Sequence, residues 1–167
     1  MSMKTDILQS ARDLLKDVTP LKADCGLYCD RACCKDNGEA GSCVWLLPGE
    51  DGESMNWGKQ YKSEMPVTKA SVRALYCAAP CERDFRPFLC RIFPLTPYFS
   101  DKKQLWSVRM DRRAAAVCPL YGCGKKGLRA DFVKAAEEAV QILASDAEYE
   151  AFLKRLEAEE TAYRMTL

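Results

Sequence analysis

Apolar residues recur at helical spacing near both ends of the chain. The first stretch predicts a helix over residues 5–18, ended by Pro20, whose apolar face consists of Ile7, Leu8, Ala11, Leu14, Leu15 and Val18. Near the C-terminus a second apolar stripe runs from Phe132 to Ala144, and Ser145-x-x-Glu148 is a capping box that opens a further helix. We expect these two helices, within residues 129–164, to pack as an antiparallel pair on a small β region.

Between the helical ends the pattern is irregular at first and then predicts short strands. Residues 21–42 combine glycine, charged residues and cysteines without an apolar period, which is typical of a segment organised by ligation. The next residues predict a turn and several strands. The turn is at residues 48–53, and the strands are Val44–Leu47, Tyr61–Val67 and Ser71–Cys77. Residues 94–110 are predicted to form a hairpin that turns at Asp101–Lys103. The prediction is a small single α+β domain over residues 1–167, with a cysteine-rich, metal-organised core at residues 25–123.

The charge balance argues against a general attraction to nucleic acid or to an anionic membrane. Lysine and arginine number 25 and aspartate and glutamate 24, and 48% of the residues are hydrophobic. Arg109, Arg112 and Arg113 form a basic spot near Trp106, but such a spot is more often a solvated face than a nucleic-acid contact. We therefore expect neither a membrane nor a nucleic acid as partner, and a protein partner stays open.

The first residues carry charges on an amphipathic pattern, whereas a secretory signal would be apolar. No stretch approaches the roughly 18 consecutive apolar residues of a transmembrane helix. Because thiols stay reduced in the cytosol, we expect a cytoplasmic protein whose cysteines are available to a metal ion.

Ten cysteines and no histidine define the candidate chemistry. The densest group is Cys25-x3-Cys29-x3-Cys33-Cys34, in which residues four apart on a helical turn can bring their sulfurs to one tetrahedral ion. Cysteine thiolates are preferred ligands of zinc and of iron. Because neighbouring side chains diverge, one of the two adjacent cysteines can join the first group while the other faces a second ion or the core.

Two further cysteine segments follow. The stretch from Arg86 to Pro94, Arg-Pro-Phe-Leu-Cys-Arg-Ile-Phe-Pro, predicts about two helical turns between prolines that carry Cys90 inward, with Cys81 just before it. Its arginines, Arg86 and Arg91, either donate to the thiolate site or form surface ion pairs. The third segment contains Cys118-Pro119 and Cys123, and its Cys-Pro step resembles the end of many cluster-binding loops.

These motifs resemble the YkgJ-type cysteine-cluster family, which is described as zinc- or iron-chelating. The resemblance covers about residues 25–123, and its most specific part is the Arg-Pro-x-x-Cys-Arg-x-Phe-Pro stretch. This chain departs from the family in the first cluster, where each gap is three residues instead of two. The resemblance implies a chelating set of Cys25, Cys29, Cys33, Cys34, Cys81, Cys90 and Cys118. Cys43, Cys77 and Cys123 fall outside the family pattern and form a second tier, which either completes a second site or is inert.

Three functions remain open at this point. The first is chelation of zinc at one or two sites in a structural or chelating role, and the second is an iron–sulfur cluster protein in electron transfer or in an oxidoreductase or protein methylase. The third is a metal-free thiol–disulfide redox protein, although no Cys-x-x-Cys spacing is present. No catalytic constellation is apparent, because the chain has no histidine to pair with a nucleophile, no phosphate-binding loop and no Gly-x-Gly-x-x-Gly stretch.

Overall fold

The structure is a computed structural model, and it describes residues 3–34, 43–50, 58–77 and 83–165. Its α-helices are α1 (Met3–Asp13), α2 (Gly26–Cys29), α3 (Phe88–Ile92), α4 (Ala130–Ala144) and α5 (Ala147–Met165). Its strands are β1 (Cys43–Trp45), β2 (Gly58–Glu64), β3 (Ser71–Cys77), β4 (Leu95–Ser100) and β5 (Leu105–Met110). Short 3₁₀ helices connect them, namely η1 (Ala32–Cys34), η3 (Arg83–Phe85), η4 (Arg112–Ala116), η5 (Pro119–Cys123) and η6 (Lys125–Gly127).

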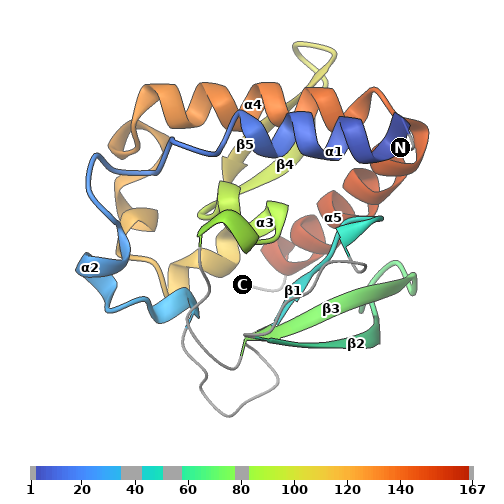
Figure 1. The fold of residues 1–167 in the computed structure, drawn as a ribbon, viewed down its shortest axis with the longest axis horizontal. Helices are drawn as coiled ribbons and strands as arrows, with labels where there is room; N and C mark the ends of the chain where they lie inside the picture. Colours follow the sequence, from blue (N-terminus) through green and yellow to red (C-terminus); the bar gives the residue numbers. More distant parts are fainter. Residues whose placement is uncertain (1–2, 35–42, 51–57, 78–82, 166–167) are drawn as a thin grey trace.

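The strands form two small antiparallel sheets. One has the order β1-β3-β2, and the other is the β4–β5 hairpin, in which Leu95 faces Met110 and Ser100 faces Leu105. Figure 1 shows the three-stranded sheet below the helical layer and the hairpin behind it. The expected mixture of helices, small sheets and C-terminal helices is therefore confirmed.

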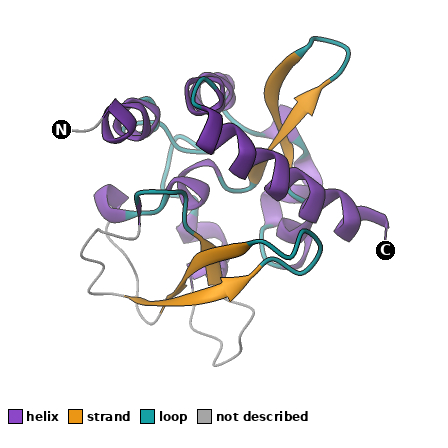
Figure 2. Cartoon of the chain, turned by 90° about the vertical axis from the view of Figure 1, so that its right-hand side faces the viewer, coloured by secondary structure: helices purple, strands orange, loops and turns teal. Residues whose placement is uncertain are grey.

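The helices cover the hairpin, but not as the expected antiparallel C-terminal pair. α4 packs most extensively on β5 and along α1, while α5 packs on β4 and has fewer contacts with α4. In Figure 2, α1 and α4 are seen nearly end-on, and α5 starts beside α4 and runs away from α1 toward the C-terminus. The partner that runs beside α4 is thus α1, because the short connection after α4 turns α5 toward the other edge of the hairpin.

The core is apolar and lies where these helices meet the hairpin. Its fully buried side chains include Leu15, Leu47, Met65, Leu75, Phe88, Ile92, Leu95, Phe132, Leu143, Leu153 and Leu156. Every described cysteine side chain is partly or fully exposed. The described residues do not show a cysteine-rich, metal-organised core; their interior is filled by apolar side chains of the helices and strands.

Two helix ends differ from the sequence prediction. α1 ends at Asp13, five residues before the predicted end, although Leu15 is still fully buried. The Arg83 side chain explains this end, because it donates to the backbone oxygens of Leu15, Lys16 and Val18. The backbone carbonyls of Leu15, Lys16 and Val18 thus accept hydrogen bonds from an arginine in another part of the chain. In a longer helix these carbonyls would point along the helix axis.

The N-cap of α5 is Asp146 instead of the predicted Ser145. The Asp146 side chain accepts hydrogen bonds from the backbone N–H groups of Glu148 and Tyr149, at 2.9 and 3.2 Å. Ser145 Oγ donates to the oxygen of Ile142 at 2.6 Å and so closes the end of α4. Both residues are good capping types, and the one nearer to α5 takes the role.

Strand bounds agree best where turns are local. β3 occupies the predicted residues 71–77, and the hairpin strands lie within the predicted residues 94–110. β1 covers residues 43–45, whereas the predicted strand is Val44–Leu47. β2 begins and ends three residues earlier than predicted, because Met65 and Lys69 belong to a turn closed by Lys69 N–H donating to Met65 O at 3.0 Å. Pro48 and Gly49 form part of the expected turn, and residues 51–53 lie outside the described residues. No helix among the described residues is long and apolar enough to span a bilayer.

Candidate metal centre

The cysteine segment after α1 is built around one helical turn. Cys25 stands just before α2, Cys29 ends it, and the Cys29 thiol lies 3.8 Å from the backbone oxygen of Cys25. Asp30 and Arg31 then adopt positive φ values of 48° and 55°, which reverse the chain toward η1. The predicted four-residue spacing therefore places Cys25 and Cys29 one turn apart on the same side of α2.

Cys118 approaches this turn from a distant part of the sequence. Burial raises the pKa of the Cys25 thiol, and the negative charge of Asp24 adds to this effect. The charges of Cys29 and Cys118 raise the pKa of Cys25 as well, while Arg86 lowers it. Such mutual effects require the thiols to lie near one another, so the fold brings Cys25, Cys29 and Cys118 into one neighbourhood, here called the thiol cluster.

The Cys118 thiol has its own local setting at the start of η5. Burial raises its pKa, the backbone N–H groups of Leu120 and Tyr121 lower it by hydrogen bonding, and Cys29 raises it again. The result is a raised pKa, so the neutral thiol is favoured while no cation compensates the charge of the thiolate. α2 and the segment containing η5 and η6 lie on the same side of the molecule in Figure 1.

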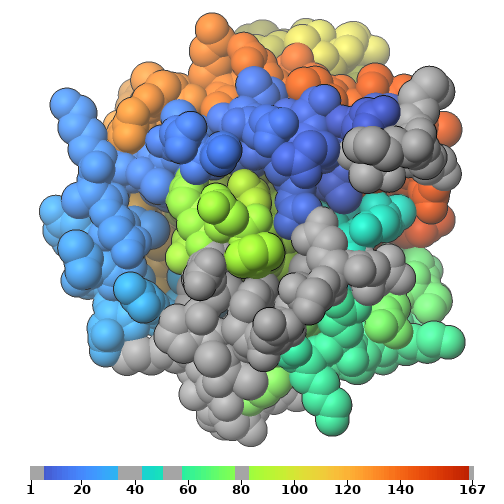
Figure 3. Space-filling view, viewed as in Figure 1, coloured from blue at the N-terminus to red at the C-terminus, as the bar shows by residue number. Residues whose placement is uncertain are grey.

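Segment 83–93 lies next to this cluster, and arginines hold it in place. Figure 3 shows it (lime) beneath α1 and beside the N-terminal cysteine segment (light blue). Burial and the charge of Arg86 lower the pKa of Arg83, whereas Cys25 raises it. Arg83 and Arg86 thus supply positive charge beside Cys25, and Arg83 also ties η3 to the end of α1 through backbone oxygens.

Arg91 follows neither of the two roles expected for it. It is buried, and it donates to the oxygen of Arg86 at 3.0 Å through Nε and to the oxygen of Asp84 at 2.7 Å through Nη2. Burial lowers its pKa, and the neighbouring positive charges of Arg12 and Arg83 lower it further. Arg91 shapes the backbone that leads from η3 into α3 and is a positioning residue for Cys90.

The start of α3 is fixed by Glu50, a residue that the sequence analysis missed. Glu50 is fully buried, and its carboxylate accepts hydrogen bonds from the N–H groups of Phe88 at 2.7 Å and Leu47 at 2.9 Å. Arg12 of α1 lies 3.9 Å from the same carboxylate and donates to Arg86 O at 3.2 Å. Glu50 therefore serves as the missing N-cap of a helix that begins at a proline, and it sets the position of half-buried Cys90.

The remaining predicted ligands are distributed more widely. Cys33 is exposed in η1, and the Cys34 side chain and Cys81 lie outside what the structure describes. Cys43 and Cys77 lie on the three-stranded sheet, where a hydrogen bond to Cys43, together with burial, raises the pKa of Tyr61 to about 12. Cys123 is exposed at the end of η5, where it packs closely on Gly127.

Comparison of the chain with protein-family models, with curated proteins and with solved structures found no match. Its function is therefore argued from its own residues. Among the described side chains, no group of three or more cysteine, histidine, aspartate or glutamate residues has the arrangement to hold a metal ion. What the described part contributes is the approach of Cys118 to Cys25 and Cys29 beside two arginines, with the pKa values of Cys25 and Cys118 raised by burial.

Two of the three arginines in the predicted basic spot form ion pairs within the fold. Arg109 forms an ion pair with Glu160 and lies 5.1 Å from the ring centre of Tyr98. Arg113 pairs with Asp111 at 2.6 Å and lies 5.6 Å from the ring centre of Trp45. These two guanidinium groups stabilise the domain internally and offer little charge to a nucleic-acid backbone.

Proposed function

We propose that this protein binds a soft metal ion, zinc in the first instance, through cysteine thiolates that include Cys25, Cys29 and Cys118. The observation that carries the proposal is the approach of Cys118 to Cys25 and Cys29 across about ninety residues of sequence, in which Cys29 and Cys118 raise the pKa of Cys25 and Cys29 raises the pKa of Cys118. Thiols crowded in this way repel one another once deprotonated, and a bound cation converts that repulsion into attraction. The side chain of Cys34 and residue Cys81 are candidates to complete the ligand set, together with Cys33 and Cys90.

The packing of the cysteine-bearing elements supports the same proposal. α2, η3, η5 and η6 contain no buried residues, although the first three adjoin or carry cysteines of the predicted ligand set. Leu120 of η5 packs partly buried on the core, and elements with so little buried apolar surface gain little from the hydrophobic effect. A metal ion that joins α2 to the start of η5 would supply the missing stabilisation, as structural zinc does in small domains.

A structural or chelating role fits these residues better than a catalytic one. The chain has no histidine, and Arg83, one of the two arginines beside the cluster, donates to backbone oxygens at the end of α1. With four thiolates, zinc is coordinatively saturated and has no open position for a substrate. We therefore propose that the metal links the N-terminal cysteine segment to the segment after β5.

The test is metal content per chain, measured on full-length protein purified without oxygen or chelator. Wild type is compared with Cys25→Ser, Cys118→Ser and Cys43→Ser, the last being an exposed cysteine on the sheet and a matched control. We expect stoichiometric zinc in wild type and Cys43→Ser, and a loss of zinc in the two cluster variants. Chelation of the wild type should speed hydrogen exchange in α2 and η5 while α4 and β5 stay protected, because their stability comes from the apolar core.

The other functions give different results in the same experiment. Iron with matching sulfide would replace the zinc proposal by an iron–sulfur protein, and absence of metal together with a Cys25–Cys118 or Cys29–Cys118 disulfide would replace it by a redox protein. Equal metal content in all three variants would refute the assignment of the thiol cluster as the binding site.

A further inference from the structure

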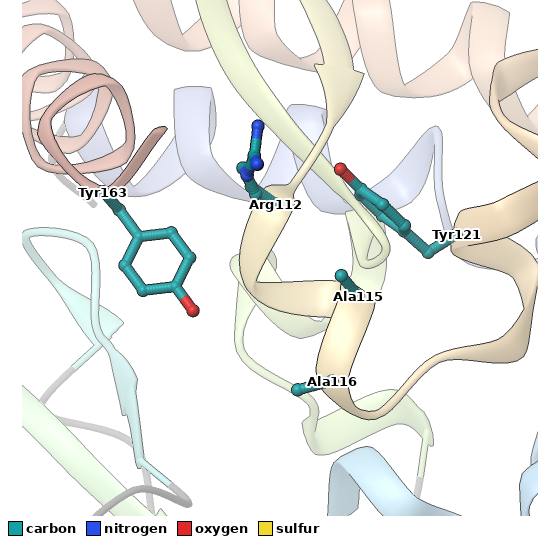
Figure 4. Close-up of a pocket in the computed structure, with 5 residues that line it drawn as sticks. All are labelled: Arg112, Ala115, Ala116, Tyr121 and Tyr163. Atoms are coloured by element: carbon teal, nitrogen blue, oxygen red, sulfur yellow. The ribbon is translucent and has the colours of Figure 1, made fainter. Parts of the chain in front are cut away.

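A cleft separate from the thiol cluster lies between the end of α5 and the 3₁₀ helices that follow β5. Its volume is about 590 Å³, and it is lined by Arg112, Ala115, Ala116, Tyr121 and Tyr163. Figure 4 shows the two tyrosines on opposite sides of Arg112, with the Tyr121 hydroxyl directed toward Arg112 and the Tyr163 hydroxyl directed away from the Arg112 guanidinium, toward the side where Ala116 lies. A volume of this size falls within the range of roughly 300–1,000 Å³ typical of small-molecule sites.

The charge around this cleft is unbalanced, and Arg112 is the reason. Arg109 and Arg164 both pair with the fully buried Glu160, and Arg113 pairs with Asp111. Arg112 is half-buried, and in the part of the chain that the structure describes its guanidinium forms no hydrogen bond or ion pair. Four arginines thus meet two carboxylates in this region, and of the two excess positive charges one is shared by Arg109 and Arg164 at Glu160 and the other sits on Arg112, which lines the cleft.

From this arrangement we infer that the cleft binds a small organic anion, a carboxylate or phosphate attached to a flat apolar body. A guanidinium binds either group through two parallel hydrogen bonds, and the site offers Arg112 for that role. The tyrosine rings supply apolar faces for the body of the ligand and hydroxyls for its polar edge. The small side chains of Ala115 and Ala116 leave room for a planar group above them.

The cleft and the thiol cluster share one short element. Tyr121 lies in η5, whose first turn begins at Cys118, and the N–H of Tyr121 donates to the oxygen of Cys118 at 3.0 Å. The wall formed by Tyr121 is therefore placed by the same segment that carries a proposed metal ligand. The anion site nevertheless rests on its own observations, the geometry of the cleft and the unbalanced charge of Arg112.

The experiment is a titration of the full-length protein, carrying ¹³C-labelled tyrosine rings, followed by NMR. The probes are benzoate, phenyl phosphate and neutral benzamide, and the ring signals are assigned with Tyr121→Phe and Tyr163→Phe. Of the seven tyrosines, we expect the signals of these two to shift saturably with both anions, while exposed Tyr28 stays unchanged. The preferred anion identifies the source of the ligand as a carboxylic acid or a phosphate ester.

Substitution of Arg112 decides whether its charge is responsible. Arg112→Gln should weaken benzoate binding about tenfold or more, because a charge-assisted hydrogen-bond pair is lost. The benzoate affinity of Arg112→Lys should fall between those of wild type and Arg112→Gln. This variant keeps the test valid if the glutamine variant does not fold. Arg155→Gln, which removes an exposed arginine of α5, is the matched control and should bind like wild type.

Three results would overturn the inference: no saturable shift with either anion, equal affinity in Arg112→Gln and wild type, or benzamide binding as tightly as benzoate. Metal content is determined on the same samples. Anion binding by protein that contains no metal would contradict only the metal proposal. Metal-loaded protein that binds neither anion would contradict only the proposed anion site in the cleft.

Discussion

Replacement of Glu50 tests how the cysteine-bearing helix α3 is held to the rest of the domain. The Glu50 carboxylate is fully buried and accepts two backbone hydrogen bonds, from Phe88 at 2.7 Å and from Leu47 at 2.9 Å. Arg12, with 6% of its side chain exposed, lies 3.9 Å away. Glu50→Ala therefore strands two buried N–H groups and deprives a buried guanidinium of its carboxylate.

The size of the effect follows from these contacts. A hydrogen bond to a charged group contributes about 1.5–3 kcal/mol, and removal of one partner of a buried ion pair costs about 3–5 kcal/mol. These contributions overlap, and the 3.9 Å separation from Arg12 is longer than a hydrogen bond. We expect Glu50→Ala to lower the free energy of unfolding by about 3–5 kcal/mol, and Glu50→Gln, which can keep one acceptor, by about 2 kcal/mol.

Urea unfolding of metal-free protein, followed by tryptophan fluorescence, measures both variants. For a chain of this size, the alanine variant should also melt about 10 °C lower. The matched cycle adds Arg12→Met alone and with Glu50→Gln, and the double variant should lose at least about 1 kcal/mol less than the sum of the single losses. A loss below about 1 kcal/mol for Glu50→Ala, or strict additivity in the cycle, would refute the assigned role of Glu50.

Three further perturbations test other contacts of the fold. Glu159→Gln should lower the free energy of unfolding by about 1.5–3 kcal/mol and speed hydrogen exchange at the β2–β3 turn, because amides and a threonine hydroxyl of this turn donate to the Glu159 carboxylate. Unchanged hydrogen exchange at the turn would contradict this. Burial acts to raise the pKa of Glu137, but hydrogen bonds from a lysine and a serine lower it overall, so its contribution is present at neutral pH and is lost as pH falls through the lowered value. The difference in unfolding free energy between wild type and Glu137→Gln should therefore shrink between about pH 5 and pH 3, and a constant difference would count against it. Gly127→Ala should destabilise by about 1–3 kcal/mol, because its Cβ would lie 2.3 Å from that of Cys123, whereas Gly122→Ala meets nothing within 4 Å; equal stabilities would rule out the clash.

Local patterns in the sequence predicted the elements whose bounds depend on neighbouring residues. In β3 and in the β4–β5 hairpin, the residues that favour a strand and the residues that favour a turn lie within a few positions of each other. The structure has these strands at the predicted places. The end of α1 could not be read in this way. Its apolar spacing continues through Leu15 to Val18, yet the backbone there is turned by Arg83, which lies more than sixty residues away.

The candidate site divides along the same line. The spacing of Cys25 and Cys29 is a property of one helical turn, so the sequence predicts their proximity without knowledge of the fold. The approach of Cys118 depends on how β5 ends and on the course of η4, which no short motif encodes. Glu50 was missed because it stands in a turn-rich acidic segment that resembles solvent-exposed loop, and only the arrival of α3 and Arg12 buries its carboxylate.

The two sides of the molecule are stabilised by different means. On the side of the sheets, carboxylates of α5 bind backbone groups and arginines, as Glu159 does at the β2–β3 turn and Glu160 does between Arg109 and Arg164, above a well-filled apolar core. On the cysteine side, α2, η5 and η6 contain no fully buried residue, and what the described residues show there is Leu120 of η5 packed partly buried on the core and Lys125 of η6 paired with Glu137 of α4 at 2.9 Å. Raised thiol pKa values on that side mean that metal-free protein holds protons where a cation would bind, and metal uptake should release them. We therefore expect the affinity of the proposed metal site to fall as the pH falls, and removal of the metal to loosen the cysteine side more than the apolar core.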